Sequence, residues 1–245
     1  MEVHHHPHVP HGSKKFKDYF LEFLMIFLAV SMGFFAENVR EYITDKNHVE
    51  ELSGQLREDL KNDTANVQKL IEFESVQVKR TDSLYAMLIQ PPGHIDYKKL
   101  QDMIVSCDRM DIFYPSAGAI STIKKDLHLK EFVRTKIALH IDNYEKMVTV
   151  LQAFENRNIE YLGKYIETFL SNHFTPENAA VAVVRMPVVN GTMRNLKPAD
   201  LVQLSVDINL IKAYNLVLLN RYTKVKSEAT AFIQHINSTY KLDNN

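Results

Sequence analysis

An apolar run of 18 residues near the start of the chain, Tyr19 to Ala36, limits the fold more than any other feature. As a helix it would be about 27 Å long, close to the hydrocarbon core of a bilayer at about 30 Å. Glu22 is its only charged residue and lies one turn from its start, within reach of the headgroups. The run therefore predicts a membrane-spanning helix over 19–36, in which Glu22 is a candidate functional carboxylate.

Two other interpretations of this run remain open. A cleavable signal peptide would find small residues for its cleavage site between Ala29 and Ser31. Against it, the apolar stretch continues to Phe35 and contains Glu22, and both features are unusual in such a leader. A buried core helix of a soluble protein is the second alternative, but no other part of the chain is apolar all round. We therefore interpret the run as a retained anchor.

Small residues within the run favour the close approach of two such helices. Ala29 and Gly33 are four positions apart, and Ala36 continues the same side of the helix. Where side chains are small, two membrane helices can pack backbone against backbone. The spacing predicts association through Ala29, Gly33 and Ala36, with a second copy of the chain or with another membrane protein.

The charges on either side of the run predict its orientation. Lys14, Lys15 and Lys17 precede it, whereas residues 37–51 are mixed in charge and net acidic. The positive-inside rule then puts the N-terminus in the cytoplasm and the bulk of the chain across the membrane. In a bacterium this predicts an inner-membrane protein. Its parts would be a disordered cytoplasmic tail at 1–18, a transmembrane helix at 19–36 and a periplasmic helical domain at 37–245.

Composition favours long helices in that domain. The chain has only seven glycines and eight prolines among 245 residues, and hence few turn signals. Its single cysteine, Cys107, cannot form an internal disulfide, so the fold needs an apolar core, in which we expect Cys107 to be buried. The net charge of −1 shows none of the basic excess of a nucleic-acid-binding protein, so no nucleic-acid partner is expected.

Helical periodicity runs through the first part of the domain. Between Glu37 and Gln90 there is no proline, and apolar residues recur every three or four positions. The sequence Pro91-Pro92-Gly93 predicts the end of this helix, which we expect to form a stalk. A shorter helix is predicted over Lys98–Met110, followed by a loop whose Ser116 is a candidate N-cap for the next helical turn.

A further long helix is predicted over Leu129–Leu170, followed by irregular structure at Ser171–Lys197. In the second segment Asn190-Gly191 suggests a small hairpin. The helix carries a seam of residues at alternating four- and three-residue steps, and Ile141, Val148, Leu162 and Phe169 widen this stripe, as suits packing in a bundle. The predicted seam positions are Val133, Ile137, His140, Tyr144, Met147, Leu151, Phe154, Asn158, Tyr161 and Tyr165.

The last predicted helix starts after Pro198 and has the most regular pattern. Asp200 suits its first turn, where a negative charge favours the helix dipole. Its seam steps by three and four residues over about five heptads, as in coiled coils. The positions are Leu201, Leu204, Ile208, Ile211, Asn215, Leu218, Tyr222, Val225, Ala229, Phe232 and Ile236.

Three polar residues interrupt the two long seams: His140, Asn158 and Asn215. A polar residue on a seam can fix the register or the oligomeric state. Alternatively, the three could form a buried pocket for a ligand. The first interpretation treats them as satisfied core groups, and the second as a binding site.

The N-terminal tail is rich in histidine. It contains His4, His5, His6, His8 and His11 between prolines, which oppose a helix. Neutral imidazoles bind zinc, nickel or copper, but a flexible tail offers no fixed geometry. These five histidines are weak candidates for metal binding, and a plain disordered tail is the alternative.

No catalytic motif is present. The sequence lacks GxSxG, a Walker loop, HExxH, GxGxxG and CxxC. We therefore expect neither an enzyme nor a resident cofactor.

Two stretches resemble a group of uncharacterised single-pass inner-membrane proteins common in Bacteroidetes. One is the anchor with the polar residues that follow it, among them Glu37, Asn38 and Arg40. The other includes the small-residue turn at 116–118 and Asn143-Tyr144, although relatives often have Ser-Gly where this chain has Ala117-Gly118. The resemblance implies an N-terminal anchor with a helical extracytoplasmic domain and brings no known activity.

Together these features predict an all-α chain with one N-terminal transmembrane helix and a bundle of long helices with coiled-coil-like seams. The function we expect is that of a membrane-anchored interaction or scaffold protein, with the lipid bilayer and a homo-oligomer or another membrane protein as partners. The alternatives are a periplasmic ligand-sensing module that acts through a partner, and metal binding by the histidine tail.

Overall fold

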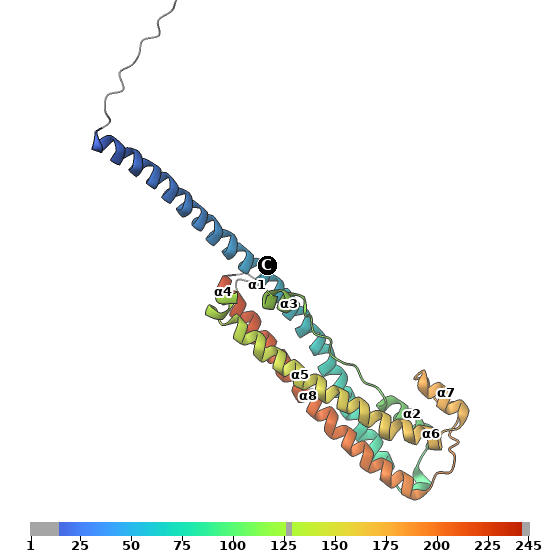
Figure 1. The fold of residues 1–245 in the computed structure, drawn as a ribbon. Helices are drawn as coiled ribbons and strands as arrows, with labels where there is room; N and C mark the ends of the chain where they lie inside the picture. The colour runs from blue at the N-terminus through green and yellow to red at the C-terminus, as the bar shows by residue number, and fades with distance from the viewer. Residues whose placement is uncertain (1–14, 126–128, 242–245) are drawn as a thin grey trace, which may run out of the picture. The chain divides into compact units, whose positions relative to one another are not determined.

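The computed structural model describes residues 15–125 and 129–241, and their regular structure is helical (Figure 1). Within these ranges the only pairing of extended backbone is an isolated bridge between Phe174 and Met193. The chain divides into two units, one up to Glu50 and one from Glu51 onward. The predicted all-α fold class is therefore confirmed.

Helix α1, Phe16–Leu88, has 73 residues and includes both the apolar run and the predicted stalk. It ends before Pro91, as predicted, because a residue that precedes proline is disfavoured in helical conformation. A single 3₁₀ turn, Pro92–His94, follows. In the first unit, the large apolar residues of the run except Leu24 are exposed, with Phe27 at 54% and Met32 at 70%.

Helix α8, Pro198–Tyr240, forms the predicted last helix. At its start, the carboxylate of Asp200 accepts a hydrogen bond from the backbone N–H of Lys197 at 2.7 Å. All eleven predicted seam residues, from Leu201 to Ile236, are buried. The heptad pattern therefore identified the core face of α8 correctly.

The predicted helix over 129–170 is broken into four parts. These are α4 (Leu129–Arg134), α5 (Ile137–Tyr161), a π-helical turn (Leu162–Glu167) and α6 (Thr168–His173). The break before α5 lies at Lys136, whose φ of 63° is left-handed and incompatible with a continuing helix. The prediction of one uninterrupted helix was wrong here.

The buried face of α5 also differs from the predicted seam. The prediction was correct at Ile137, Tyr144, Leu151 and Asn158 and wrong at the positions between them. Val133 of α4 is 60% exposed. Four further buried residues, Ile141, Val148, Leu162 and Phe169, lie on the predicted apolar flank of the seam, whereas Glu155 and Ile166 are buried where no core position was predicted.

The π-helical turn changes which side chain follows Leu162 on this buried face. Such a turn takes up one additional residue, so that Ile166, rather than Tyr165, is buried next. The heptad pattern alone predicted Tyr165.

Three short helices complete the second unit: α2 (Tyr97–Cys107), α3 (Gly118–Lys125) and α7 (Pro176–Val183). Helix α2 stops three residues before the predicted Met110. Helix α7 occupies part of the segment predicted to be irregular, where Thr175 Oγ1 accepts from the N–H of Asn178 at 3.3 Å. Pro176 suits the first helical turn because its N–H would have no helical partner.

Ser116 does not cap α3, contrary to the prediction. The carboxylate of Asp59, on α1, accepts from the backbone N–H of Ala119 at 3.0 Å instead. A side chain from another helix therefore satisfies this helix start.

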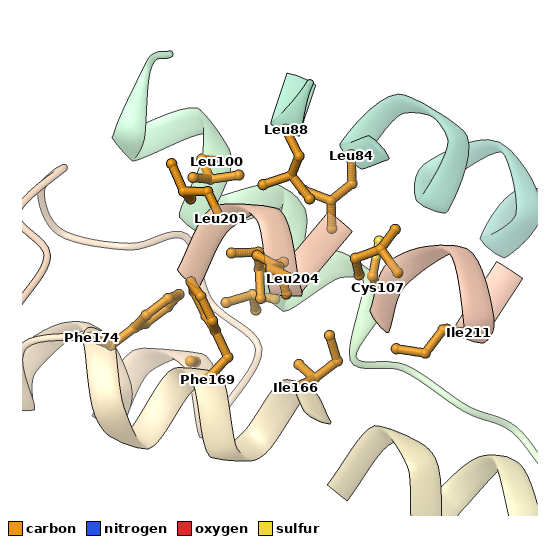
Figure 2. Packing of buried hydrophobic residues seen from close by; sticks show 14 of the residues in the cluster. Leu84, Leu88, Leu100, Cys107, Ile166, Phe169, Phe174, Leu201, Leu204 and Ile211 are labelled. Carbon is orange, nitrogen blue, oxygen red and sulfur yellow. The ribbon is translucent and has the colours of Figure 1, made fainter. Parts of the chain in front are cut away.

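One apolar cluster joins α1, α2, α6 and α8 (Figure 2). Leu84, Leu100, Ile166 and Leu204 are at most 1% exposed and come from four different elements. Cys107 belongs to this cluster and is 2% exposed, as predicted. Burial raises the pKa of its thiol to about 12, which keeps the thiol protonated and unreactive at neutral pH.

Candidate functional site

An extended segment, residues 108–117, connects α2 to α3 along the bundle (Figure 1). It has no neighbouring strand, so side chains satisfy its backbone. Gln77 Nε2 donates to the carbonyl of Arg109 at 2.9 Å. The N–H of Phe113 donates to Glu155 Oε1 at 2.8 Å, and that of Ser116 to Asp63 Oδ1 at 2.8 Å.

Two buried tyrosines bind the same carboxylates. The hydroxyl of Tyr144 donates to Asp63 Oδ2 at 2.5 Å, and that of Tyr222 donates to Glu155 Oε1 at 2.6 Å. Burial, followed by the hydrogen bond to the carboxylate, raises the pKa of both tyrosines, so they remain donors at any physiological pH. Helices α1, α5 and α8 are thereby joined to the extended segment through polar contacts.

Glu74 is the third buried acid of this region. It is 1% exposed, and its Oε2 has no hydrogen-bond partner among the described residues. Burial, with smaller contributions from the charges of Glu155 and Asp111, raises its pKa to about 8. Glu74 therefore carries a proton at neutral pH inside the bundle.

The acidic residues of this region have two chemical roles: Asp63 and Glu155 accept hydrogen bonds that stabilise the fold, and Glu74 holds a proton. Asp63 Oδ1 and Glu155 Oε1 each accept a hydrogen bond from a backbone N–H of the extended segment, and Phe113 is 2% exposed. In the described part of the chain, no group of three or more histidine, cysteine, aspartate or glutamate side chains is arranged to hold a metal ion. Asp63 and Glu155 thus hold the extended segment in place through its backbone N–H groups.

Asn158 and Asn215, two of the three polar seam residues, meet inside the bundle. Asn158 Nδ2 donates to Asn215 Oδ1 at 3.2 Å, and both side chains are buried. Asn158 Oδ1 accepts no hydrogen bond from the described residues. The two amides thus form a polar pair between α5 and α8.

His140 lies apart from this pair. It is 18 residues before Asn158, which corresponds to about 27 Å along the axis of α5. Its Nδ1 is 3.6 Å from Glu228 Oε1, and its ring stacks on Phe232 and lies against His235. The three side chains therefore do not converge on one pocket, and a ligand-sensing role stays a prediction.

Of the remaining candidate residues, the small residues of the apolar run are exposed, and the tail histidines lie outside the described part of the chain. Ala29, Gly33 and Ala36 are all exposed on α1, and no atom lies within 4 Å of a Cβ added at Gly33. This side of the helix is thus open to a neighbour, and self-association stays a prediction. The tail histidines at positions 4, 5, 6, 8 and 11 lie outside the described residues, so metal binding there also stays a prediction.

The buried acids of α1 were not among the residues predicted from the sequence. The buried positions in the second part of α1 step by four and three residues, in the manner of a heptad seam. They are Leu56, Leu60, Asp63, Val67, Leu70, Glu74, Gln77, Thr81, Leu84 and Leu88. The spacing alone would have indicated Asp63 and Glu74 had polar residues been allowed on the seam.

No family model matches the chain, and neither the curated proteins nor the solved structures include a match. The likeness to single-pass inner-membrane proteins of Bacteroidetes therefore rests on the sequence alone and stays a prediction.

Proposed function

We propose that the chain is a membrane-anchored helical interaction protein of the bacterial inner membrane, with its bundle in the periplasm. One observation carries the proposal: α1 and α8 are both long and apolar enough to span a membrane, but their surroundings differ. In α8, 39% of the most apolar window is buried, and in α1 none of it is. Apolar side chains without protein neighbours need another apolar environment, and a bilayer provides it.

The second unit supports a role in binding rather than in chemistry. Two of its buried acids, Asp63 and Glu155, are engaged with backbone N–H groups and tyrosine hydroxyls, so they hold the fold in place. The anchor would concentrate copies in the membrane, and the open side at Ala29, Gly33 and Ala36 suits helix pairing.

Membrane extraction with a charged variant tests the anchor. We expect the wild-type chain to remain in membranes washed with alkaline carbonate. The double variant Phe27→Arg, Leu28→Arg should be lost from them, since each arginine at the centre of a span costs about 2.5–3.5 kcal/mol. The matched control Thr223→Arg, Lys224→Arg changes two exposed residues of α8 and should stay in the membrane. Wild-type chain in the soluble fraction would refute the proposal.

Cysteine labelling tests the orientation. The exposed residues Lys15 and Gln234 are each replaced by cysteine. A membrane-impermeant maleimide should label Gln234→Cys in intact spheroplasts and Lys15→Cys only after lysis. Cys107 is buried, so it should give no background. The reverse pattern would contradict a cytoplasmic N-terminus.

A further inference from the structure

The outward face of α8 carries no charge over its first half. Within 202–220, all exposed residues are uncharged, and most are apolar. They are Val202, Gln203, Val206, Asn209, Leu210, Ala213, Leu216, Val217 and Asn220. We call this set the uncharged face of α8. Val202 is 65% exposed and Val206 50%.

The charged residues in this part of α8 are directed elsewhere. Asp207 is 7% exposed and accepts from Gln203 Nε2 at 3.0 Å. Lys212 pairs with Asp82 of α1, and the guanidinium of Arg221 lies 5.0 Å from the ring centre of Phe154. The uncharged face therefore has no charge within it that would favour water.

The second half of the same helix differs. Its exposed residues are mainly polar and include a lysine: Thr223, Lys224, Ser227, Thr230, Ala231, Gln234 and Ser238. The buried seam continues through both halves, so the core does not explain the contrast. An apolar, uncharged surface of this length is typical of an interface.

The uncharged face has the spacing of a second helix seam. Val202, Val206, Asn209, Ala213, Leu216 and Asn220 step by four and three residues in alternation. This period keeps a stripe facing one partner helix along its whole length. The small side chain of Ala213, near the middle, allows that helix to approach closely.

The two asparagines make the seam complementary to itself. In a parallel pair, Asn209 and Asn220 each face their own equivalents. In an antiparallel pair centred between Ala213 and Leu216, Asn209 faces Asn220 of the second copy, because both lie equally far from that centre. An amide both donates and accepts, so an asparagine satisfies another asparagine in either arrangement.

A lipid surface fits this face less well than a helix does. Helices that lie on membranes carry lysine and arginine along the polar border of the apolar face, for contact with anionic headgroups. Here the nearest cations on α8, Lys212 and Arg221, are half-buried and engaged with Asp82 and Phe154, and the first exposed cation, Lys224, lies beyond the end of the face.

We infer that a second copy of this chain packs on the uncharged face of α8, forming a helix-paired homodimer of the second unit. The inference rests on the self-association that the proposed function includes, and it assigns that contact to α8.

Disulfide trapping of the full-length chain in nanodiscs tests the arrangement. With a mild oxidant, Ala213→Cys alone should give covalent dimers if the pair is parallel. Mixed Ala213→Cys and Leu216→Cys chains should do so if it is antiparallel. Thr230→Cys, on the polar half, should give none. The absence of trapped dimers from all α8 variants would overturn the inference.

Mass measurement in detergent by light scattering provides the second test. Val206→Glu combined with Leu216→Glu should reduce the dimer fraction about tenfold or more, because each carboxylate would be buried in the interface. Thr223→Glu combined with Thr230→Glu is the matched control and should leave the dimer intact. Circular dichroism should be unchanged in both, since all four positions are exposed.

The variant Gly33→Ile separates this inference from the proposed function. If Gly33→Ile abolishes the dimer and the Val206→Glu, Leu216→Glu variant does not, self-association through the anchor stands and the α8 contact is refuted. If the wild-type chain is monomeric in the membrane, self-association itself is refuted. An undiminished dimer in the Val206→Glu, Leu216→Glu variant, with the loss of binding to another protein or to vesicles, would assign the face to that partner.

Discussion

Two apolar helices of this chain place similar side chains in opposite surroundings. Phe27 in α1 is 54% exposed, whereas Phe232 in α8 is fully buried. Hydropathy describes both helices as apolar, so it does not distinguish a helix that needs a bilayer from one that needs a core. The difference lies in periodicity: α8 concentrates its apolar residues on stripes, and the run in α1 is apolar on every side.

Truncation of the two phenylalanines should give the largest contrast. We expect Phe232→Ala to lower the free energy of unfolding of the bundle by about 3–5 kcal/mol, because it leaves a cavity in a packed core. Phe27→Ala should change it by less than about 0.5 kcal/mol. Urea unfolding of the full-length chain in mild detergent, followed by circular dichroism, measures both values. Similar losses in the two variants would show that α1 is packed against protein at Phe27.

Helix α1 itself shows a second contrast between side-chain polarity and burial. Its apolar run is exposed, whereas its acidic residue Glu74 is buried. Burial raises the pKa of Glu74 to about 8 from an ordinary value of 4.5. Between these values the folded state holds a proton that the unfolded state has lost, so stability falls as pH rises from about 4.5 to about 8. Above that range the loss is complete.

The variant Glu74→Gln should remove this dependence. Relative to the wild type, we expect it to be more stable at pH 8.5, by on the order of 4 kcal/mol, and nearly equal at pH 4.5. Urea midpoints at the two pH values provide the measurement. Glu72→Gln, two residues away and exposed, should show no such difference. Equal pH profiles for the wild type and Glu74→Gln would indicate that water reaches this carboxyl.

The sequence predicted the elements that depend on local pattern. The extent of α1, its end before Pro91, and the core face of α8 follow from apolar spacing and proline chemistry. The buried acids could not be predicted in this way, because a carboxylate on an amphipathic helix usually faces water. Asp63 is buried because Tyr144, 81 residues later, supplies a hydroxyl.

The break at Lys136 and the π-helical turn after Tyr161 also escaped prediction. Neither position contains a proline, and Gly163 lies within the turn rather than at a helix end. Both features lie against α8, which is distant in sequence: the carbonyl oxygen of Thr135 is 2.7 Å from His235 Nε2, and Ile166 belongs to the apolar cluster that includes Leu204. For the candidate site, sequence alone therefore identified the asparagine pair by position but not its separation from His140.

Loss of the Tyr144 hydroxyl should give the smallest of these effects. In Tyr144→Phe, Asp63 Oδ2 would lose its donor while it remains inside the bundle. A buried acceptor left without a partner costs about 1–3 kcal/mol. The exposed Tyr114→Phe is the matched control and should be neutral. In a double-mutant cycle, Asp63→Asn should make the cost of Tyr144→Phe smaller, because the charged acceptor has been removed. Additive effects would mean that the two side chains act independently, and the polar contact between α1 and α5 would then contribute little to the stability of the bundle.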